Sequence, residues 1–319
     1  MTQLNITPWL QFTDSIEAFQ GQNSTSEIFE DEIFEILKLI LLFYIAASLI
    51  SIICIFGLVG NAIVIWYLCF LIKKNPITTY VLNLAAADSG VLLSLGFICI
   101  KIFSISLDIH SWLLHCFFLT YTSSQYLLTA ISVEKCLSVV FPIWYRCHRP
   151  KYLSALICTL LWIMSCLMLG ELFSFVVENS DLVNQITSIV NFIVCTPVVI
   201  ICTILLFIRT YCSVYQHQRG KFYAALLRIL LIFIFFGTPL SIAFILLYFD
   251  SLNYVHSSYL FIISVICASI NSSVNPLIYF LIGRKKMKRS RETFRLVLQS
   301  IFSDNIDCRV GGQPVSVEK

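Results

Sequence analysis

The chain has 319 residues, of which 58% are hydrophobic and 12% are charged, and its mean hydropathy is +0.87. Soluble domains average roughly 45–50% apolar and about 25% charged residues, so this composition excludes an ordinary water-soluble domain. The formal net charge is only +3. We therefore expect a membrane protein that is surrounded by membrane lipids and has no nucleic-acid partner.

Seven apolar stretches, separated by short polar segments, follow one another along the chain. A membrane-spanning helix needs about 20 consecutive, mostly apolar residues, and each stretch is long enough. The predicted fold is an all-α membrane protein, a bundle of seven transmembrane helices within residues 37–282. The helices are expected at residues 37–72, 77–101, 112–138, 152–176, 186–211, 222–249 and 257–282.

Residues 1–36 precede the first span and are expected to be extracellular and glycosylated. The first residues are polar and the first apolar run is too long for the core of a cleavable signal peptide, so we expect the first span to direct insertion. Acceptor sequons for N-glycosylation occur at Asn5 and Asn23. A third match, at Asn271, falls inside the seventh span, where the glycosylating enzyme does not reach.

The basic residues indicate the orientation. All of the 21 Lys and Arg residues except Lys38 and Lys101 lie on loops or span ends that share one side of the membrane. Basic residues near span ends stay in the cytosol. We therefore expect an extracellular N-terminus, a cytosolic C-terminus and a multi-pass location in the plasma membrane.

Several polar residues lie at the depth of the hydrocarbon, where each of them needs a partner. Asp88 is the deepest acid, and Asn61, Ser124, Asn271 and Asn275 lie at comparable depth. Their oxygens suit a hydrated monovalent cation, an allosteric Na⁺, because hard cations prefer oxygen ligands. A water-filled hydrogen-bond network that only fixes packing explains the same residues, and residue types alone do not separate the two.

Prolines interrupt the last three spans. Pro197, Pro239 and Pro276 each remove a backbone hydrogen bond from their helix. A single proline indicates a static bend, whereas three prolines in consecutive spans favour hinges.

Two sets of motifs resemble a known class of receptors. Asn61, Leu-Ala-Ala-Ala-Asp88, Trp162, Pro197, Pro239 and Asn275-Pro-Leu-Ile-Tyr279 occur in the order and spacing of rhodopsin-like, class A G-protein-coupled receptors, over about residues 50–300. Within that class the chain resembles the Mas and Mas-related receptors. The strings that carry this resemblance are Leu-Leu-Thr-Ala-Ile-Ser-Val-Glu-Lys-Cys-Leu-Ser-Val, Pro-Ile-Trp-Tyr-Arg-Cys-His-Arg-Pro-Lys and Ser-Ile-Asn-Ser-Ser-Val-Asn-Pro.

The resemblance implies a receptor that is not an enzyme. It would bind an extracellular ligand and activate a heterotrimeric G protein by an outward movement of the sixth helix, with arrestin as a further partner. Rhodopsin-like receptors usually carry a tryptophan two residues before the sixth-helix proline, but this chain has Gly237 there, as Mas-related receptors do. Other groups must then trigger the movement, and Phe235, Phe236 and Tyr126 are the candidates.

The cytosolic ends of the third and seventh helices are implied to take part in coupling. In the rhodopsin-like class the third helix ends in an acid followed by an arginine, but here Glu134 is followed by Lys135. Lysine keeps the charge and loses the planar fork that donates paired hydrogen bonds. We expect weaker contact with the G protein or altered basal activity. The alternative is that Lys135 merely extends to the membrane interface. Pro276 and Tyr279 are the implied residues of the seventh helix.

Acidic residues dominate the expected outer side, and such a field attracts cations. Glu171 lies close to where Mas-related receptors place the carboxylate that binds cationic ligands, and Asp181 is a second candidate. The resemblance therefore implies a cationic peptide or amine as ligand. The second outer loop, about residues 178–187, contains no cysteine. It cannot form the disulfide that pins this loop in many rhodopsin-like receptors, so we expect a short, unpinned loop.

Residues 283–319 are expected to be a cytosolic segment. From Arg284 to Phe302 basic and apolar residues alternate, which predicts a short amphipathic eighth helix on the anionic inner leaflet. Cys308 lies late for a palmitoylation site, and a disordered tail is expected there.

Three other functions fit the composition. A transporter or channel is one, but the chain has no internal repeat, no glycine-rich pair of broken helices and no ring of pore charges. An intramembrane enzyme would need a catalytic pair, and neither Gly-x-Ser-Gly nor a second deep aspartate accompanies Asp88. A weakly coupling orphan receptor is the third alternative.

Overall fold

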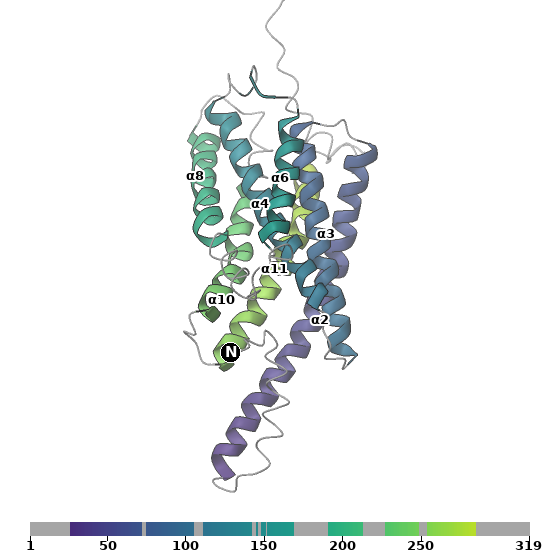
Figure 1. The fold of residues 1–319 in the computed structure, drawn as a ribbon, viewed down its shortest axis with the longest axis vertical. Coiled ribbons are helices and arrows are strands. Elements are labelled where there is room, and N and C mark those ends of the chain that lie inside the picture. The colour runs from purple at the N-terminus through teal and green to yellow at the C-terminus, as the bar shows by residue number, and fades with distance from the viewer. Residues whose placement is uncertain are drawn as a thin grey trace, which may run out of the picture.

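The computed structural model describes residues 26–71, 75–104, 111–141, 145, 148–150, 152–168, 191–212, 227–248 and 254–284. These residues form seven helices packed as a bundle, without a strand among them (Figure 1). The helices are α2 (Ser26–Phe70), α3 (Pro76–Phe103), α4 (Ser111–Val140), α6 (Leu153–Met168), η1 (Asn191–Cys195) continued by α8 (Thr196–Cys212), residues 227–232 continued by η2 (Phe233–Gly237) and α10 (Pro239–Tyr248), and α11 (Tyr254–Arg284).

The predicted bundle of seven helices is confirmed, and every predicted span overlaps one of these helices. The predicted eighth helix lies almost entirely outside the described residues, because α11 ends at Arg284. The glycosylation sites predicted at Asn5 and Asn23 also lie outside the described residues.

The first helix is longer than its predicted span. It has 45 residues and begins at Ser26, not at residue 37. At ~1.5 Å per residue it measures about 68 Å, more than twice the ~30 Å thickness of the hydrocarbon. Its first part projects beyond the rest of the bundle (Figure 1). There the exposed Lys38 Nζ lies 2.6 Å from Glu35 Oε1 one turn away, a pair that suits water and not lipid.

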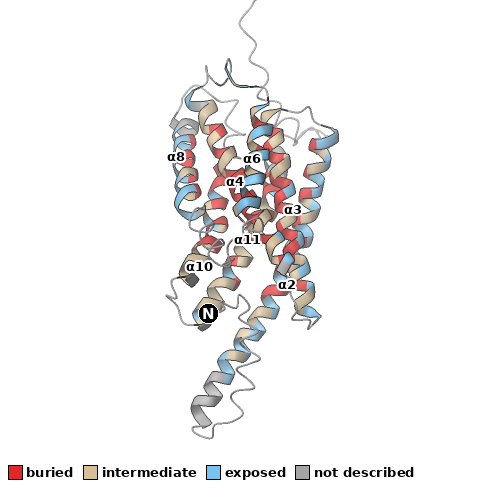
Figure 2. Ribbon diagram, in the orientation of Figure 1, coloured by how far each residue is buried: buried red, intermediate tan, exposed pale blue. Residues whose placement is uncertain are grey.

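The outer surface of the bundle is apolar. Buried residues line the inward sides of the helices and exposed ones the outward sides (Figure 2). Many of the exposed residues are large hydrophobics such as Phe56, Phe70 and Leu41. Four of the described helical stretches are long and apolar enough to cross a membrane: Ile33–Phe70, Pro76–Phe103, Leu227–Leu246 and Val255–Ile278. Two shorter apolar helices cover Leu153–Leu167 and Phe192–Ile208.

Close helix contacts depend on small residues. A Cβ atom added to Gly57 of α2 would lie 2.7 Å from Leu92 Cδ1 of α3 and 2.7 Å from Ser273 Cβ of α11. In lipid, helices associate through such close packing because the hydrophobic effect does not drive them together. The three helices α2, α3 and α11 therefore form one tightly packed side of the bundle.

Two of the predicted proline breaks follow π-helical turns. Pro197 is the second residue of α8 and comes directly after η1, whereas Pro239 is the first residue of α10 and comes shortly after η2. Proline is tolerated at the start of an α-helix because the first amides have no intrahelical acceptor. Pro276 differs, since it lies inside the continuous helix α11.

Candidate functional site

Asp88 is the centre of the buried polar core. Its side chain is fully buried in α3, and each of its carboxylate oxygens accepts one hydrogen bond. Ser124 Oγ of α4 donates to Oδ1 at 2.7 Å, and Asn275 Nδ2 of α11 donates to Oδ2 at 2.8 Å. One carboxylate thus joins three helices, and three residues of the predicted polar group lie together here.

The other polar residues of the predicted group have different roles. Asn61 Nδ2 donates to Ser272 O at 3.0 Å and to Gly57 O at 3.1 Å, so Asn61 ties α2 to the backbone of α11. Asn271 is buried and lies close to Gly237: a Cβ atom added to Gly237 would lie 3.5 Å from Asn271 Nδ2. Ser272 is close enough to interact with Asp88, and its buried hydroxyl makes no other hydrogen bond within the described residues.

The residues around Asp88 fit a monovalent cation. A single carboxylate is accompanied by the hydroxyls of Ser124 and Ser272, which are oxygen ligands of the kind that hard cations prefer. No group of three or more His, Cys, Asp or Glu side chains that could hold a metal ion occurs in the described part of the chain.

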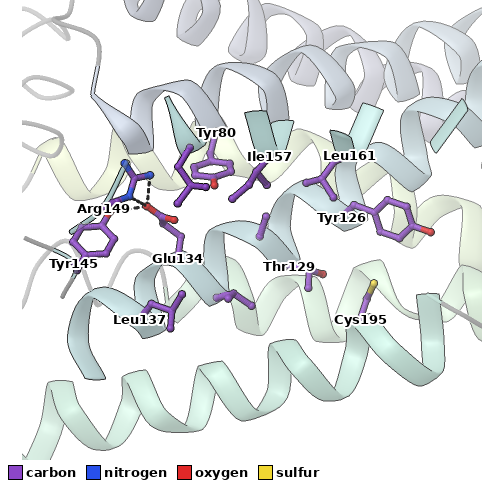
Figure 3. Close-up of a pocket in the computed structure, with 13 residues that line it drawn as sticks. Tyr80, Tyr126, Thr129, Glu134, Leu137, Tyr145, Arg149, Ile157, Leu161 and Cys195 are labelled. Atoms are coloured by element: carbon purple, nitrogen blue, oxygen red, sulfur yellow. Dashed lines mark hydrogen bonds and ion pairs between the residues drawn. The ribbon is translucent and has the colours of Figure 1, made fainter. Parts of the chain in front are cut away.

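Glu134 accepts several polar contacts at the predicted cytosolic end of α4. Its Oε1 accepts from the Tyr145 hydroxyl at 2.7 Å and from Arg149 Nε at 2.8 Å, and Arg149 Nη2 lies 2.6 Å from the same oxygen (Figure 3). Arg149 Nη2 also donates to Ser154 Oγ at the start of α6. The carboxylate thereby fixes the loop that follows α4 against both α4 and α6.

Tyr145 is a stable donor in this cluster. Burial, together with the hydrogen bond to Glu134, raises the pKa of the Tyr145 phenol above its ordinary value. The phenol therefore stays protonated at physiological pH. The Arg149 guanidinium lies over the Tyr145 ring at 5.2 Å from its centroid, a cation–π contact that holds both side chains in place.

The interpretation of Lys135 as a residue that extends to the membrane interface is wrong. The Lys135 side chain is buried, with 2% of its surface exposed. Glu134 forms an ion pair with Arg149, whose Nη2 lies 2.6 Å from Glu134 Oε1. An arginine from the loop therefore supplies the guanidinium that is missing after Glu134 in the sequence.

The sixth helix, which comprises residues 227–232, η2 and α10, is bonded to α4 at Gly237, where rhodopsin-like receptors usually carry a tryptophan. The buried Tyr121 hydroxyl donates to Gly237 O at 2.6 Å. A Cβ atom at Gly237 would lie 2.7 Å from Phe233 Cδ2, so the Phe233 ring takes up the space beside the glycine. Sequence reasoning missed both Tyr121 and Phe233. The available signal was a tyrosine in the middle of an apolar span, because a buried tyrosine hydroxyl needs an acceptor.

The proposed trigger residues are distributed differently from the prediction. Phe235 is 70% exposed on the outer surface of the bundle and cannot transmit a movement between helices, so this candidate is wrong. Phe236 is partly buried. Tyr126 is buried and lines a cavity together with Cys195 of η1 (Figure 3).

Comparison with known proteins gives the family. The family model described as 7 transmembrane receptor (rhodopsin family) matches residues 60–181. The proto-oncogene Mas of Rattus norvegicus is 35% identical over 82% of this chain and 86% of its own length. The chain belongs to the Mas and Mas-related family of rhodopsin-like receptors. Human Mas is 35% identical over 79% of this chain and 82% of its own length, and human Mas-related G-protein coupled receptor member D is 34% identical over 85% and 89%.

Family membership defines the broad function of this Mas-related receptor. It is a multi-pass protein of the plasma membrane that responds to an extracellular ligand and acts on a G protein, and it is not an enzyme. The interpretation as a transporter or channel is therefore set aside. The membership also accounts for the spacing of Asn61, Asp88, Trp162 and the three prolines, which is typical of rhodopsin-like receptors.

Some predicted site residues lie outside the described part of the receptor. Glu171 and Asp181, the predicted ligand contacts, fall in residues 169–190 between α6 and η1. Tyr279 belongs to α11, but its side chain is among those not described. The ten cysteines whose side chains are described are free, including Cys116 of α4.

Proposed function

We propose that this receptor binds a cationic peptide or amine on its extracellular side and activates a heterotrimeric G protein by outward movement of the sixth helix. The N-terminus is then extracellular and the C-terminus cytosolic, as the distribution of Lys and Arg predicts. Arrestin is a second cytosolic partner.

The hydrogen bond from Tyr121 to Gly237 O is the observation that supports this mechanism best. It joins α4 to the sixth helix two residues before Pro239, where a π-helical turn meets an α-helix. Such junctions occur frequently at functional sites, and the proline leaves the backbone there without one of its hydrogen bonds. In the closed receptor this contact takes the role that a tryptophan side chain plays in other rhodopsin-like receptors.

The closed state gains one hydrogen bond from Tyr121, which is worth about 0.5–1.5 kcal/mol net. A change of that size shifts a two-state equilibrium roughly two- to twelvefold. Tyr121→Phe should therefore raise ligand-independent guanine-nucleotide exchange by this factor in reconstituted receptor. Tyr44→Phe, on the lipid side of α2, is the matched control. If Tyr121→Phe shows wild-type basal exchange and wild-type agonist potency, the proposed mechanism is wrong.

The acidic outer side supports the choice of ligand. A screen of basic peptides and amines on cells that express the receptor should find an agonist, and Glu171→Gln should lower its potency at least tenfold while basal exchange is unchanged. Glu27→Gln, in the first turns of α2, is the control for a general loss of negative field. An agonist that acts equally on the wild type, on Glu171→Gln and on Asp181→Asn would contradict the proposed cation-binding pocket. The proposal that the protein is a receptor would not be affected.

The buried carboxylate extends the proposal to Na⁺. Asp88, Ser124 and Ser272 would hold the ion with their oxygens, and Asn275 would position the carboxylate. NaCl should then raise the unfolding temperature of the wild type more than N-methylglucamine chloride at equal ionic strength. Asp88→Asn should abolish the difference. Equal unfolding temperatures of the wild type in the two salts would favour the interpretation as a water-filled network.

A further inference from the structure

Five aromatic rings form a continuous chain in the predicted outer half of the bundle. The Phe261 ring of α11 lies 6.0 Å from the Phe244 ring of α10, and Phe244 lies 5.2 Å from Phe118 of α4, measured between ring centroids. Phe118 lies 5.4 Å from Phe117, and Phe117 stacks on Tyr121 at 5.8 Å with 18° between the ring planes. Aromatic pairs attract each other at about 4.5–7 Å, so the rings connect three helices.

The chain of rings ends at the contact that is proposed to keep the receptor closed. The Tyr121 hydroxyl donates to Gly237 O at 2.6 Å, and the Ser241 hydroxyl, one turn further along, is close enough to interact with the same phenol. Tyr121 therefore contacts the sixth helix on both sides of Pro239. Because the Phe117 ring lies nearly parallel to the Tyr121 ring, it restricts the direction in which the Tyr121 hydroxyl points.

The exposure of the rings changes along the chain. Phe117 and Tyr121 are buried, with 4% of each side chain exposed, whereas Phe118, Phe244 and Phe261 are half-buried. The half-buried rings form the outer end of the chain under the proposed topology. An extracellular ligand can therefore displace the rings at this end, and it reaches the buried end only through them.

We propose that this chain of rings triggers the movement of the sixth helix in place of the missing tryptophan, with Phe244 and Phe117 as positioning residues. A ligand that moves Phe244 away from Phe118 loosens the attachment of α10 to α4. The rings then shift against one another, and Tyr121 loses the orientation in which its hydroxyl bonds the sixth helix. The inference rests on the proposed function, in which the Tyr121 contact stabilises the closed state.

The alternative is that the rings only fill space, and the two readings differ in how substitutions combine. The test measures ligand-independent guanine-nucleotide exchange of the full-length reconstituted receptor. Phe244→Leu and Phe117→Leu each keep an apolar side chain and remove a ring contact, so each should raise basal exchange roughly two- to twelvefold. Added to Tyr121→Phe, neither change should raise exchange further, because all three act through the same contact.

Phe103→Leu is the matched control. It removes a ring from the pair with Tyr44, which joins α3 to α2 at 6.3 Å outside the chain of five rings, and basal exchange should stay at the wild-type value. Thermal unfolding confirms that each variant is folded. Phe244 is only half-buried, so its variant keeps the test independent of a packing defect in Phe117→Leu.

Two results would overturn the inference. One is wild-type basal exchange in either folded leucine variant, and the other is an increase that multiplies with the increase caused by Tyr121→Phe. If Tyr121→Phe alone still raises basal exchange in these cases, the proposed function stands without the chain of rings. If Tyr121→Phe has no effect, the proposed mechanism and the inference are both wrong.

Discussion

At the scale of single residues, Glu134 shows how a buried charge is compensated. Its 6% exposed side chain takes a guanidinium and a phenol from the loop that follows α4, although a lysine is its nearest neighbour in the sequence. A guanidinium donates in fixed directions and is weakly hydrated, so it suits a buried pair better than an ammonium group. The pair formed with Arg149 is therefore a structural contact on which the end of α4 depends.

Removing the guanidinium should destabilise the receptor. Arg149→Met leaves the Glu134 carboxylate buried without its cation, and breaking such a pair costs about 3–5 kcal/mol. Thermal unfolding of purified receptor in micelles measures the loss. Combining the change with Glu134→Gln should restore part of the stability, because the uncompensated charge is then gone. A single variant Arg149→Met that unfolds like the wild type would contradict this view of the ion pair.

Gly237 should tolerate no side chain. In Gly237→Ala the new Cβ would lie 2.7 Å from Phe233 Cδ2, so we expect a loss of about 1–3 kcal/mol from overpacking. Gly96→Ala in α3 is the matched control, because nothing lies within 4 Å of the added atom. That control should be neutral or stabilising, by up to about 1 kcal/mol from the gain in helix propensity. Unfolding curves of the two variants that coincide would disprove the packing argument.

At the scale of elements, single polar contacts fix which helices are neighbours. Asn61 joins α2 to α11, Asp88 joins α3 to α4 and α11, and Trp162 joins α6 to α3 through Nε1, which donates to Asn83 Oδ1 at 3.1 Å. Since lipid does not drive helices together, such hydrogen bonds and close packing decide the arrangement. The sixth helix is joined to α4 by the Tyr121 hydroxyl and to α11 by the Ser264 hydroxyl, and both donate to backbone carbonyls where a π-helical turn and Pro239 interrupt the α-helix.

The contact between α6 and α3 can be tested through Trp162. Trp162→Phe keeps an aromatic ring and removes the donor to Asn83, so the receptor should lose about 0.5–1.5 kcal/mol of stability. The control is Trp66→Phe, because the Trp66 side chain is 60% exposed on the outer surface of α2. Thermal unfolding in micelles compares the two. Equal effects of both changes would mean that the hydrogen bond to Asn83 does not hold α6 in place.

At the scale of the whole molecule, the receptor combines a typical transmembrane bundle with an altered coupling end. The contacts of Asp88 and the proline positions follow the rhodopsin-like pattern, whereas Lys135 replaces the arginine of the third helix and is buried. Arg149 is paired with one oxygen of the Glu134 carboxylate, so the third helix here lacks the pairing of an acid with the arginine that follows it in the sequence. Coupling is therefore the property in which this receptor should differ most from relatives that keep the arginine.

Restoring the arginine should strengthen coupling. We expect Lys135→Arg to raise agonist-driven guanine-nucleotide exchange roughly two- to twelvefold, the effect of one additional hydrogen bond of about 0.5–1.5 kcal/mol. Lys38→Arg, in the exposed pair with Glu35, controls for the change of residue type. Exchange rates of Lys135→Arg that match the wild type, with and without agonist, would show that lysine does not weaken the contact with the G protein.

The sequence by itself determined the membrane environment, the seven helices and which polar residues lie in the core. The length of an apolar stretch and the positions of the charged residues are local properties, and they decide which segments insert into the membrane. It also grouped Asp88, Ser124 and Asn275, because they are polar residues at the depth of the hydrocarbon. Only the tertiary structure decided which distant groups meet: Glu134 with Arg149, Tyr121 with Gly237 across 116 residues, and Phe118 with Phe244. These pairings depend on the packing of whole helices against one another. The hydropathy pattern of one helix does not specify which other helix will pack against it.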